Sequence, residues 1–145
     1  MEHTLAYYIT ALYRGFLDYT TQELQALGLR CGQLPFLLYV GKHPGCTPSQ
    51  LKGDLGLDWG YTQRCLMKLV KDGFLIRAHA EGNSRVYHLT LTDRGQEAFD
   101  RSHQVFQEWD DAQLGPLSPE QRQQLCQLLS PLTQDLPFPP KIFNP

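Results

Sequence analysis

Basic side chains are predicted to gather on one face of a helix that spans residues 59–72. On a helical wheel, Thr62, Cys65, Leu66 and Leu69 share the side that would face a core. The opposite side carries three basic residues and no acidic one, whereas a solvated amphipathic helix more often mixes both signs. This face therefore has the chemistry to bind a polyanion.

Individual side chains of this helix suit particular groups of double-stranded DNA. Arg64 can donate two hydrogen bonds to O6 and N7 of guanine, and Gln63 can pair with N6 and N7 of adenine. Tyr61 can stack on a sugar or contact a thymine methyl group. Lys68 and Lys71 are placed for phosphates, which position a protein on DNA without specifying the sequence.

The distribution of charge along the 145-residue chain agrees with a polyanionic partner. The formal net charge is −2, which excludes a globally basic binder of the histone type. Residues 42–94 nevertheless carry eight basic and five acidic side chains, whereas residues 95–145 carry three basic and seven acidic ones. A basic centre between acidic ends favours contact through the middle of the chain.

Capping signals define the two helices that would position the basic face. Residues 47–50, Thr-Pro-Ser-Gln, form a capping box for a helix that ends at Gly56. Asp58 can cap the next helix, which begins at Trp59 and runs to about Asp72, where Gly73 stops it. Only a short connection separates the two helices, as in a helix-turn-helix.

A predicted β-hairpin follows these helices directly. Residues 74–79 and 85–90 are β-prone runs on either side of a turn-forming segment, residues 81–84. The whole order predicts a winged helix-turn-helix, with the 59–72 helix in the major groove and Arg85 at the wing tip in the minor groove. The DNA-contacting residues expected from this arrangement are Ser49, Lys52, Trp59, Gly60, Tyr61, Gln63, Arg64, Lys68, Lys71, Arg77, Asn83, Ser84 and Arg85.

The rest of the chain is predicted to be helical. Helices are expected over residues 4–27 and 33–41, from Thr92 or Asp93 to about Gln113, and from Ser118 onward. We therefore expect a mainly α fold with a small β-hairpin wing, in a single domain that spans residues 1–145. Residues 30–92 would form its winged helix-turn-helix. The Pro-rich segment 137–145 is either disordered or an extended arm laid on a partner.

Several segments resemble the MarR family of bacterial transcription regulators. The stretch Gly45-Cys46-Thr47-Pro48-Ser49-Gln50-Leu51 is similar to the family's start of the helix-turn-helix, and residues 55–58 and 69–75 align with the segments that follow. Leu89-Thr90-Leu91-Thr92-Asp93-Arg94-Gly95 resembles its "v-x-L-T-x-x-G" signature, and residues 117–121 resemble the start of its last helix. The likeness covers residues 29–133. It departs at Asn83, where the family often has Asp, and at residues 59–61, where the family usually has small polar side chains.

The resemblance implies an obligate homodimer that reads a pseudo-palindromic operator, and it favours a repressor. Residues 1–29 and 93–136 would form the helical dimerisation layer. The terminal apolar stripes agree with this, because they exceed what a small winged domain needs to cover itself. The expected pairing surface comprises Tyr8, Leu12, Leu125, Leu128, Leu129, Leu132, Phe138, Ile142 and Phe143.

The resemblance also implies release from DNA by a small aromatic or anionic effector. Such a ligand would bind between the dimerisation layer and the winged part of the chain. The candidate pocket residues are Tyr13, Phe16, Phe36 and Tyr39. The alternative is that these four side chains belong to the core.

The four cysteines form no metal or redox motif, because no two lie closer than 15 residues. Cys31 is a candidate oxidation sensor, since the neighbouring Arg30 can favour a thiolate, and the alternative is a buried, inert thiol. His79 and His88 would face each other only in one hairpin register. Without a nearby carboxylate or thiolate they make no zinc site, so we predict no metal and no cofactor.

Other classes of function are disfavoured by the sequence. It has no Gly-rich phosphate loop, G-x-S-x-G elbow or H-E-x-x-H motif, so we predict no enzyme. It has no signal peptide and no apolar stretch long enough to span a bilayer, which predicts a cytoplasmic protein without a membrane partner. The remaining alternative is a winged-helix interaction module that uses the 59–72 face to bind another protein.

Overall fold

The computed structural model describes residues 2–80 and 82–136, apart from the side chains of Cys31, Ala80, Asn83 and Ser84. Its elements are α1 (Leu5–Ala26), the short 3-10 helix η1 (Cys31–Gln33), α2 (Leu34–Lys42), α3 (Pro48–Leu55), α4 (Trp59–Lys71), β1 (Leu75–Ala80), β2 (Asn83–Leu91), α5 (Asp93–Leu114) and α6 (Pro119–Thr133). The predicted fold class, mainly α with one hairpin, is confirmed. Phe138, Ile142 and Phe143 of the expected pairing surface lie outside the described residues.

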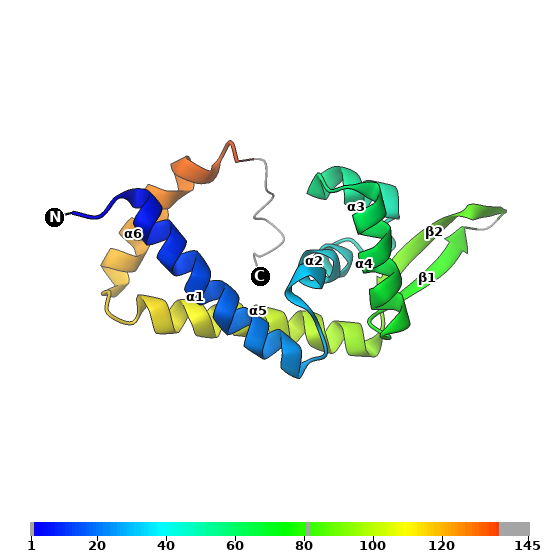
Figure 1. Ribbon diagram of the computed structural model, residues 1–145, viewed down its shortest axis with the longest axis horizontal. Helices are drawn as coiled ribbons and strands as arrows, with labels where there is room; N and C mark the ends of the chain where they lie inside the picture. Colours follow the sequence, from blue (N-terminus) through cyan, green and yellow to red (C-terminus); the bar gives the residue numbers. More distant parts are fainter. Residues whose placement is uncertain (1, 81, 137–145) are drawn as a thin grey trace.

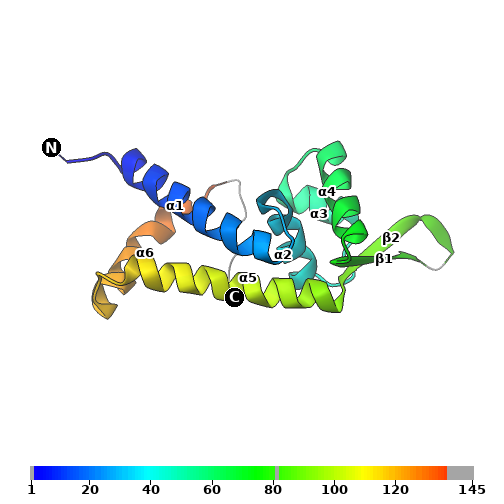
Figure 2. The same cartoon turned by 60° about the horizontal axis from the view of Figure 1, so that its bottom comes forward.

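The long helix α5 connects two ends of an elongated molecule (Figures 1 and 2). At one end, α2, α3 and α4 pack together beside the hairpin, which projects away from them. At the other end, the first half of α1 lies beside α6. No described helix combines the length and the apolar character that crossing a membrane requires.

The hydrophobic core is centred on α2. Phe36, Leu37, Leu38 and Val40 are fully buried, so this helix is apolar on almost every side. The side chains that complete the core come from every neighbouring element and include Leu24, Leu29, Leu51, Leu66, Leu69, Phe74 and Leu89. The core therefore fixes α3, α4 and the wing on one central helix.

The predicted capping signals are confirmed at both ends of α3. The Thr47 side chain accepts a hydrogen bond from the backbone N–H of Gln50, and the Gln50 side-chain oxygen accepts one from the backbone N–H of Thr47. Gly56 ends α3 with φ 64°, a left-handed conformation that glycine adopts without a steric cost. These features set the sharp turn that leads into α4.

The wing is an antiparallel pair whose register decides the question about the histidines. His79 pairs with Tyr87 and Ala78 pairs with His88, so the two imidazoles do not face each other. An isolated β-bridge between Cys46 and Leu89, which was not predicted from the sequence, adds a contact at the base of the wing. In this bridge the Leu89 N–H donates to the Cys46 carbonyl at 2.8 Å, which ties the base of the wing to the start of α3.

A close junction joins the wing to α5. The Thr92 hydroxyl donates to the Gly73 carbonyl at 2.5 Å and accepts from the Gly95 N–H at 2.9 Å. Gly95 lies directly against the backbone of Phe74, because a Cβ at this position would stand 2.0 Å from the Phe74 carbonyl oxygen. The Arg94 guanidinium lies 4.2 Å from the centre of the Phe74 ring. The junction therefore holds the wing at a fixed place on the long helix.

Candidate nucleic-acid interface

The two sides of α4 have the burial that the sequence predicted. Asp58 caps the helix by accepting a hydrogen bond from the Tyr61 N–H at 2.9 Å. Thr62, Leu66 and Leu69 are buried, while Arg64, Lys68 and Lys71 are exposed on the other side. The structure thus presents a cationic surface on α4 that its own core does not use.

The cations on this surface differ in their surroundings. Lys68 forms an ion pair with Asp72 at 3.0 Å, one turn away on the same helix. Such exposed pairs contribute only about 0.3–0.5 kcal/mol, so the ammonium group can exchange this partner for a phosphate at little cost. Within the described part of the chain, neither Arg64 nor Lys71 has an ion-pair partner. The guanidinium group of Arg64 and the ammonium group of Lys71 are therefore open to an external anion.

One flank of α4 is held by the wing. The Tyr87 hydroxyl on β2 donates to the Gln63 side-chain oxygen at 3.1 Å. The Arg77 guanidinium on β1 contacts the Met67 sulfur at 3.2 Å and lies 5.6 Å from the centre of the Tyr87 ring. These contacts orient Gln63 and Arg77, two of the residues predicted to contact DNA. Sequence reasoning missed Tyr87.

The other flank of α4 contacts η1 and the start of α2. The Tyr61 ring lies 5.9 Å from the Phe36 ring, and its hydroxyl donates to the Gly32 carbonyl at 3.5 Å. Tyr61 keeps 38% of its surface exposed, but it is turned toward these residues rather than straight outward. Its contacts are thus partly structural, which the helical wheel did not show.

The remaining predicted contact residues lie around α4. Ser49 and Lys52 are exposed on α3, and Trp59 is 44% exposed at the start of α4. Gly60 is half-buried in the first turn of α4, and Arg85 is exposed near the wing tip. The side chains of Asn83 and Ser84 lie outside the described set.

The four residues of the expected effector pocket have different surroundings in the described part of the chain. Tyr13 is 60% exposed, and the Phe16 ring packs on Phe106 and Trp109 at 5.7 and 5.2 Å. Phe36 is in the core, as the alternative interpretation held. Tyr39 is buried, and the cavity that it lines contains none of the other three. The spacing of these aromatic residues therefore reflects how α1 and α2 pack on their separate neighbours.

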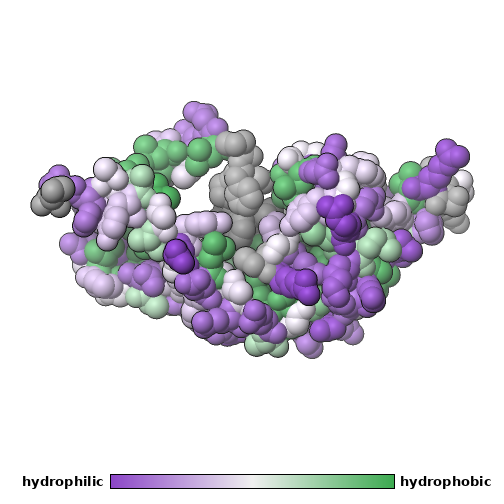
Figure 3. Space-filling model, in the orientation of Figure 1, coloured by the Kyte–Doolittle hydropathy of each residue, from purple (hydrophilic) through white to green (hydrophobic). Residues whose placement is uncertain are grey.

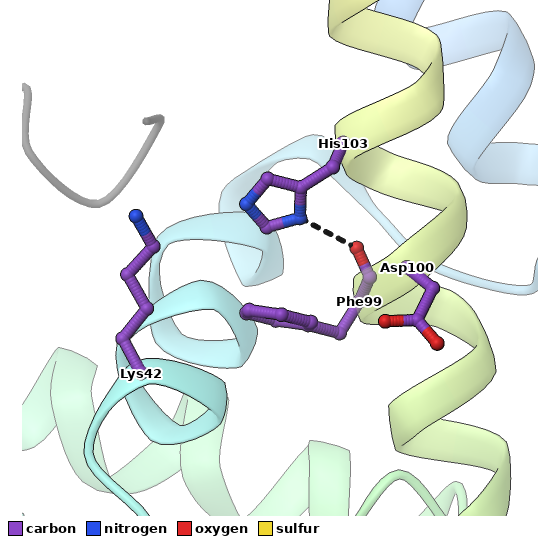
Figure 4. A pocket seen from close by; sticks show the side chains of 4 residues that line it. All are labelled: Lys42, Phe99, Asp100 and His103. Atoms are coloured by element: carbon purple, nitrogen blue, oxygen red, sulfur yellow. Dashed lines mark hydrogen bonds between the residues drawn. The ribbon is translucent and has the colours of Figure 1, made fainter. Parts of the chain in front are cut away.

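A hollow does lie between α2 and α5, where the winged part meets the long helix (Figure 4). Its lining residues are Lys42, Phe99, Asp100 and His103, and its volume is about 520 Å³. The rings of Phe99 and His103 point from α5 toward α2, and the Phe99 ring occupies the space that a side chain at Gly41 would fill. The hollow lies at the boundary where the sequence analysis expected an effector pocket, but none of the four expected residues lines it.

The described cysteines differ in exposure. Cys46 is buried, and burial raises the pKa of its thiol to about 11. Cys65 is half-buried and Cys126 is exposed. The Cys31 side chain is outside the described set, so its predicted redox role is untested. Among the described residues, no three His, Cys, Asp or Glu side chains lie close enough together to hold a metal ion.

Exposed apolar side chains gather at the end of the molecule opposite the wing. No residue of α6 is buried, and Leu128 is 70% exposed. Tyr8 and Leu12 on α1 are both about half exposed. Figure 3 shows hydrophobic surface over α6 at the upper left. Leu125, Leu129 and Leu132 lie on the same helix, and Leu125 is the most covered of the predicted pairing residues on it.

Known proteins resemble this chain in sequence and in fold. It is 41% identical over 132 residues to the HTH-type transcriptional regulator BilQ of Clostridium symbiosum, with 91% of this chain and 92% of that protein covered. It superposes on a MarR transcriptional regulator from Methanosarcina mazei with a TM-score of 0.77 and 26% identity, over 90% and 94% of the two chains. The chain belongs to the MarR family.

The chain is therefore a transcriptional regulator of the MarR type with a winged helix-turn-helix, as the motifs predicted. A MarR-family regulator from Listeria monocytogenes, solved with a 26mer DNA, has the same fold, with a TM-score of 0.75, 20% identity and coverage of 94% and 91%. A search against protein-family models finds no match.

Proposed function

We propose that this MarR-family regulator binds double-stranded DNA through the exposed face of α4, with the wing as a second contact. The observation that carries this proposal is the outward side of α4, where three exposed cations stand and the described ion pairs include only that of Lys68 with Asp72. An α-helix fits the major groove of B-form DNA, where an arginine can recognise guanine. In this arrangement Arg64 reads base edges, and Lys68 and Lys71 contact phosphates.

We further propose that the regulator acts as a homodimer and represses transcription by occupying its operator. The exposed apolar surface on α1 and α6 supports the dimer, because a second copy would cover it. Two copies of α4 then double the number of phosphate contacts, which compensates for the net charge of −2. A twofold dimer reads a pseudo-palindromic site. Repression needs no contact beyond this occupancy.

The hollow between α2 and α5 is the position that we propose for an effector. The Lys42 ammonium can attract an anionic group, and the Phe99 ring offers an apolar face. A ligand there would lie between α2, which is at the centre of the winged core, and α5, which connects the winged part to α6. It would therefore act on the separation of the two α4 helices in the dimer.

The DNA proposal is tested by fluorescence anisotropy with a duplex selected from a random pool. Arg64→Ala is expected to cost about 1–3 kcal/mol on the selected site, because it removes a base contact. Lys68→Ala is expected to weaken binding to all duplexes similarly and to flatten the salt dependence. Arg14→Ala, an exposed change on α1, is the control. Absence of duplex binding at about 50 mM salt would instead favour the protein-interaction module.

A further inference from the structure

A second cationic hollow lies on the flank of α4 that faces away from the wing. It has a volume of about 340 Å³ and is lined by Arg30, Gly32, Gln33, Tyr61, Arg64, Cys65 and Lys68. Three of these residues are basic and none is acidic. Two of them, Arg64 and Lys68, belong to the face of α4 already described, whereas Arg30 and Gln33 come from the segment before α2. The hollow therefore extends the basic surface onto a second element.

Gln33 lines this hollow, and its side chain has a donor without an acceptor among the described residues. The residue is only 4% exposed, and its side-chain oxygen accepts a hydrogen bond from the Arg30 N–H at 2.9 Å. That bond fixes the orientation of the amide group. The Nε2 atom is buried and has no hydrogen-bond acceptor among the described residues. Buried polar groups are nearly always paired, and leaving one unpaired is costly, so this donor points to an absent acceptor.

The geometry of DNA indicates what the acceptor is. A helix about 10–12 Å in diameter fills a major groove about 12 Å wide, so a sugar-phosphate strand passes along each of its flanks. The wing occupies one flank of α4 through the contacts of Gln63 and Met67. The hollow occupies the opposite flank, since Tyr61, Cys65 and Lys68 line it at spacings of four and three residues. It faces the second strand.

We propose that this hollow binds an oxyanion, a phosphate of the DNA backbone, with the exposed Arg30 guanidinium as the first donor and Gln33 Nε2, which a small side-chain movement would uncover, as the second. The proposal rests on the DNA-binding function proposed above and adds a contact from outside the helix-turn-helix. The bound phosphate also approaches Arg64 and Lys68. It would thereby fix the depth at which α4 enters the groove. A free oxyanion has the same chemistry, so the test must separate the two sources.

The matched pair Gln33→Glu and Gln121→Glu provides the binding test. In both residues the side-chain oxygen accepts a hydrogen bond from the backbone N–H three residues earlier, at 2.9 Å, and glutamate can keep this bond. Gln33→Glu removes the donor and adds a negative charge at the hollow, whereas Gln121 lies at the start of α6. A mixed-sequence 30-bp duplex suffices, because phosphate contacts are independent of sequence. Gln33→Glu is expected to weaken binding at least about tenfold, and Gln121→Glu is expected to leave it unchanged.

A second variant, Arg30→Gln, keeps the proposal testable if Gln33→Glu fails to fold. Arg30 is exposed, so its replacement should not disturb the core. It is expected to reduce the slope of log affinity against log salt by about one for each bound subunit. The proposal is overturned if the parent binds the duplex while Gln33→Glu, shown to be folded by circular dichroism, binds as tightly as Gln121→Glu. It is equally overturned if Arg30→Gln keeps the parental salt slope. If the parent binds no duplex, the proposed function itself fails.

An NMR titration identifies the source of the oxyanion. The side-chain amide signal of Gln33 is followed in the full chain as the duplex is added, and separately as inorganic phosphate is added. A shift that saturates together with the backbone signals of α4 on addition of duplex is the expected result. A Gln33 signal that responds to inorganic phosphate but not to the duplex, while α4 signals report DNA binding, would contradict a backbone phosphate.

Discussion

The exposed leucines of α6 allow the strength of the proposed dimer to be estimated. Leu128 is 70% exposed, and replacing it by alanine removes three carbon groups. At about 0.8 kcal/mol for each buried carbon group, and with the 70% exposed fraction becoming buried in the dimer, each copy loses about 1.7 kcal/mol. A twofold interface contains the residue twice, so Leu128→Ala should cost about 3–4 kcal/mol of dimerisation. The dissociation constant should rise by about 150- to 800-fold.

Sedimentation equilibrium over a wide range of protein concentrations measures this dissociation constant. Ile76→Ala is a matched control, because Ile76 is an apolar side chain that is 51% exposed on the wing, far from α6. It is expected to leave dimerisation unchanged. If Leu128→Ala dimerises as tightly as the parent, or if the parent is a monomer at micromolar concentration, the reasoning from exposed apolar surface is refuted.

Three other predictions concern the parts that hold the interface in place. Gly95→Ala should lower the free energy of unfolding by about 1–3 kcal/mol or more in urea, because the new Cβ would stand 2.0 Å from a backbone oxygen. Tyr87→Phe should weaken binding to the selected duplex by about 0.5–1.5 kcal/mol, because it removes the hydrogen bond that orients Gln63. The buried Cys46 thiol, with its pKa raised from 9.0 to about 11, should make the protein less stable by about 2–3 kcal/mol as the pH rises from 9 to 11.

Each of these predictions has a control or a contrary outcome. Gly53→Ala is the control for Gly95→Ala and should be tolerated, because no atom lies within 4 Å of the added carbon. If Gly95→Ala and Gly53→Ala have the same free energy of unfolding, the close junction is refuted. Tyr87→Phe should leave binding to mixed-sequence duplex nearly unchanged; an equal loss on both duplexes would contradict a role through Gln63. For Cys46, the unfolded thiol ionises first, so stability is retained below pH 9 and declines above it. Cys46→Ala should remove that part of the decline.

The features predicted correctly from the sequence are those that depend on near neighbours along the chain. The capping boxes at Thr47 and Ser118 and the glycine that ends α3 each act within four residues, so their types and spacing suffice. The two-sided character of α4 follows from helical periodicity alone. For the same reason, the division of its residues into buried and exposed ones was predictable.

Features that depend on tertiary contacts were not predictable in the same way. The hydrogen bond from Tyr87 to Gln63 joins residues that are 24 positions apart, and it depends on how the wing packs on α4. The surroundings of the four expected effector residues could not be predicted, because an aromatic residue at helical spacing indicates burial without showing which element it packs against. Phe36 meets Tyr61, whereas Phe16 meets Trp109 on α5.

Photo-crosslinking from α4 tests the central claim most directly. A benzophenone side chain is introduced at Met67, which is 40% exposed where the outward face of α4 meets the wing, or at the exposed Gln107 of α5 as a control. The protein is irradiated in the presence of the selected duplex. We predict DNA crosslinks from position 67 that excess unlabelled duplex removes, and none from position 107. Crosslinks to DNA from position 107 alone, or none from either position while the duplex is bound, would contradict binding through α4.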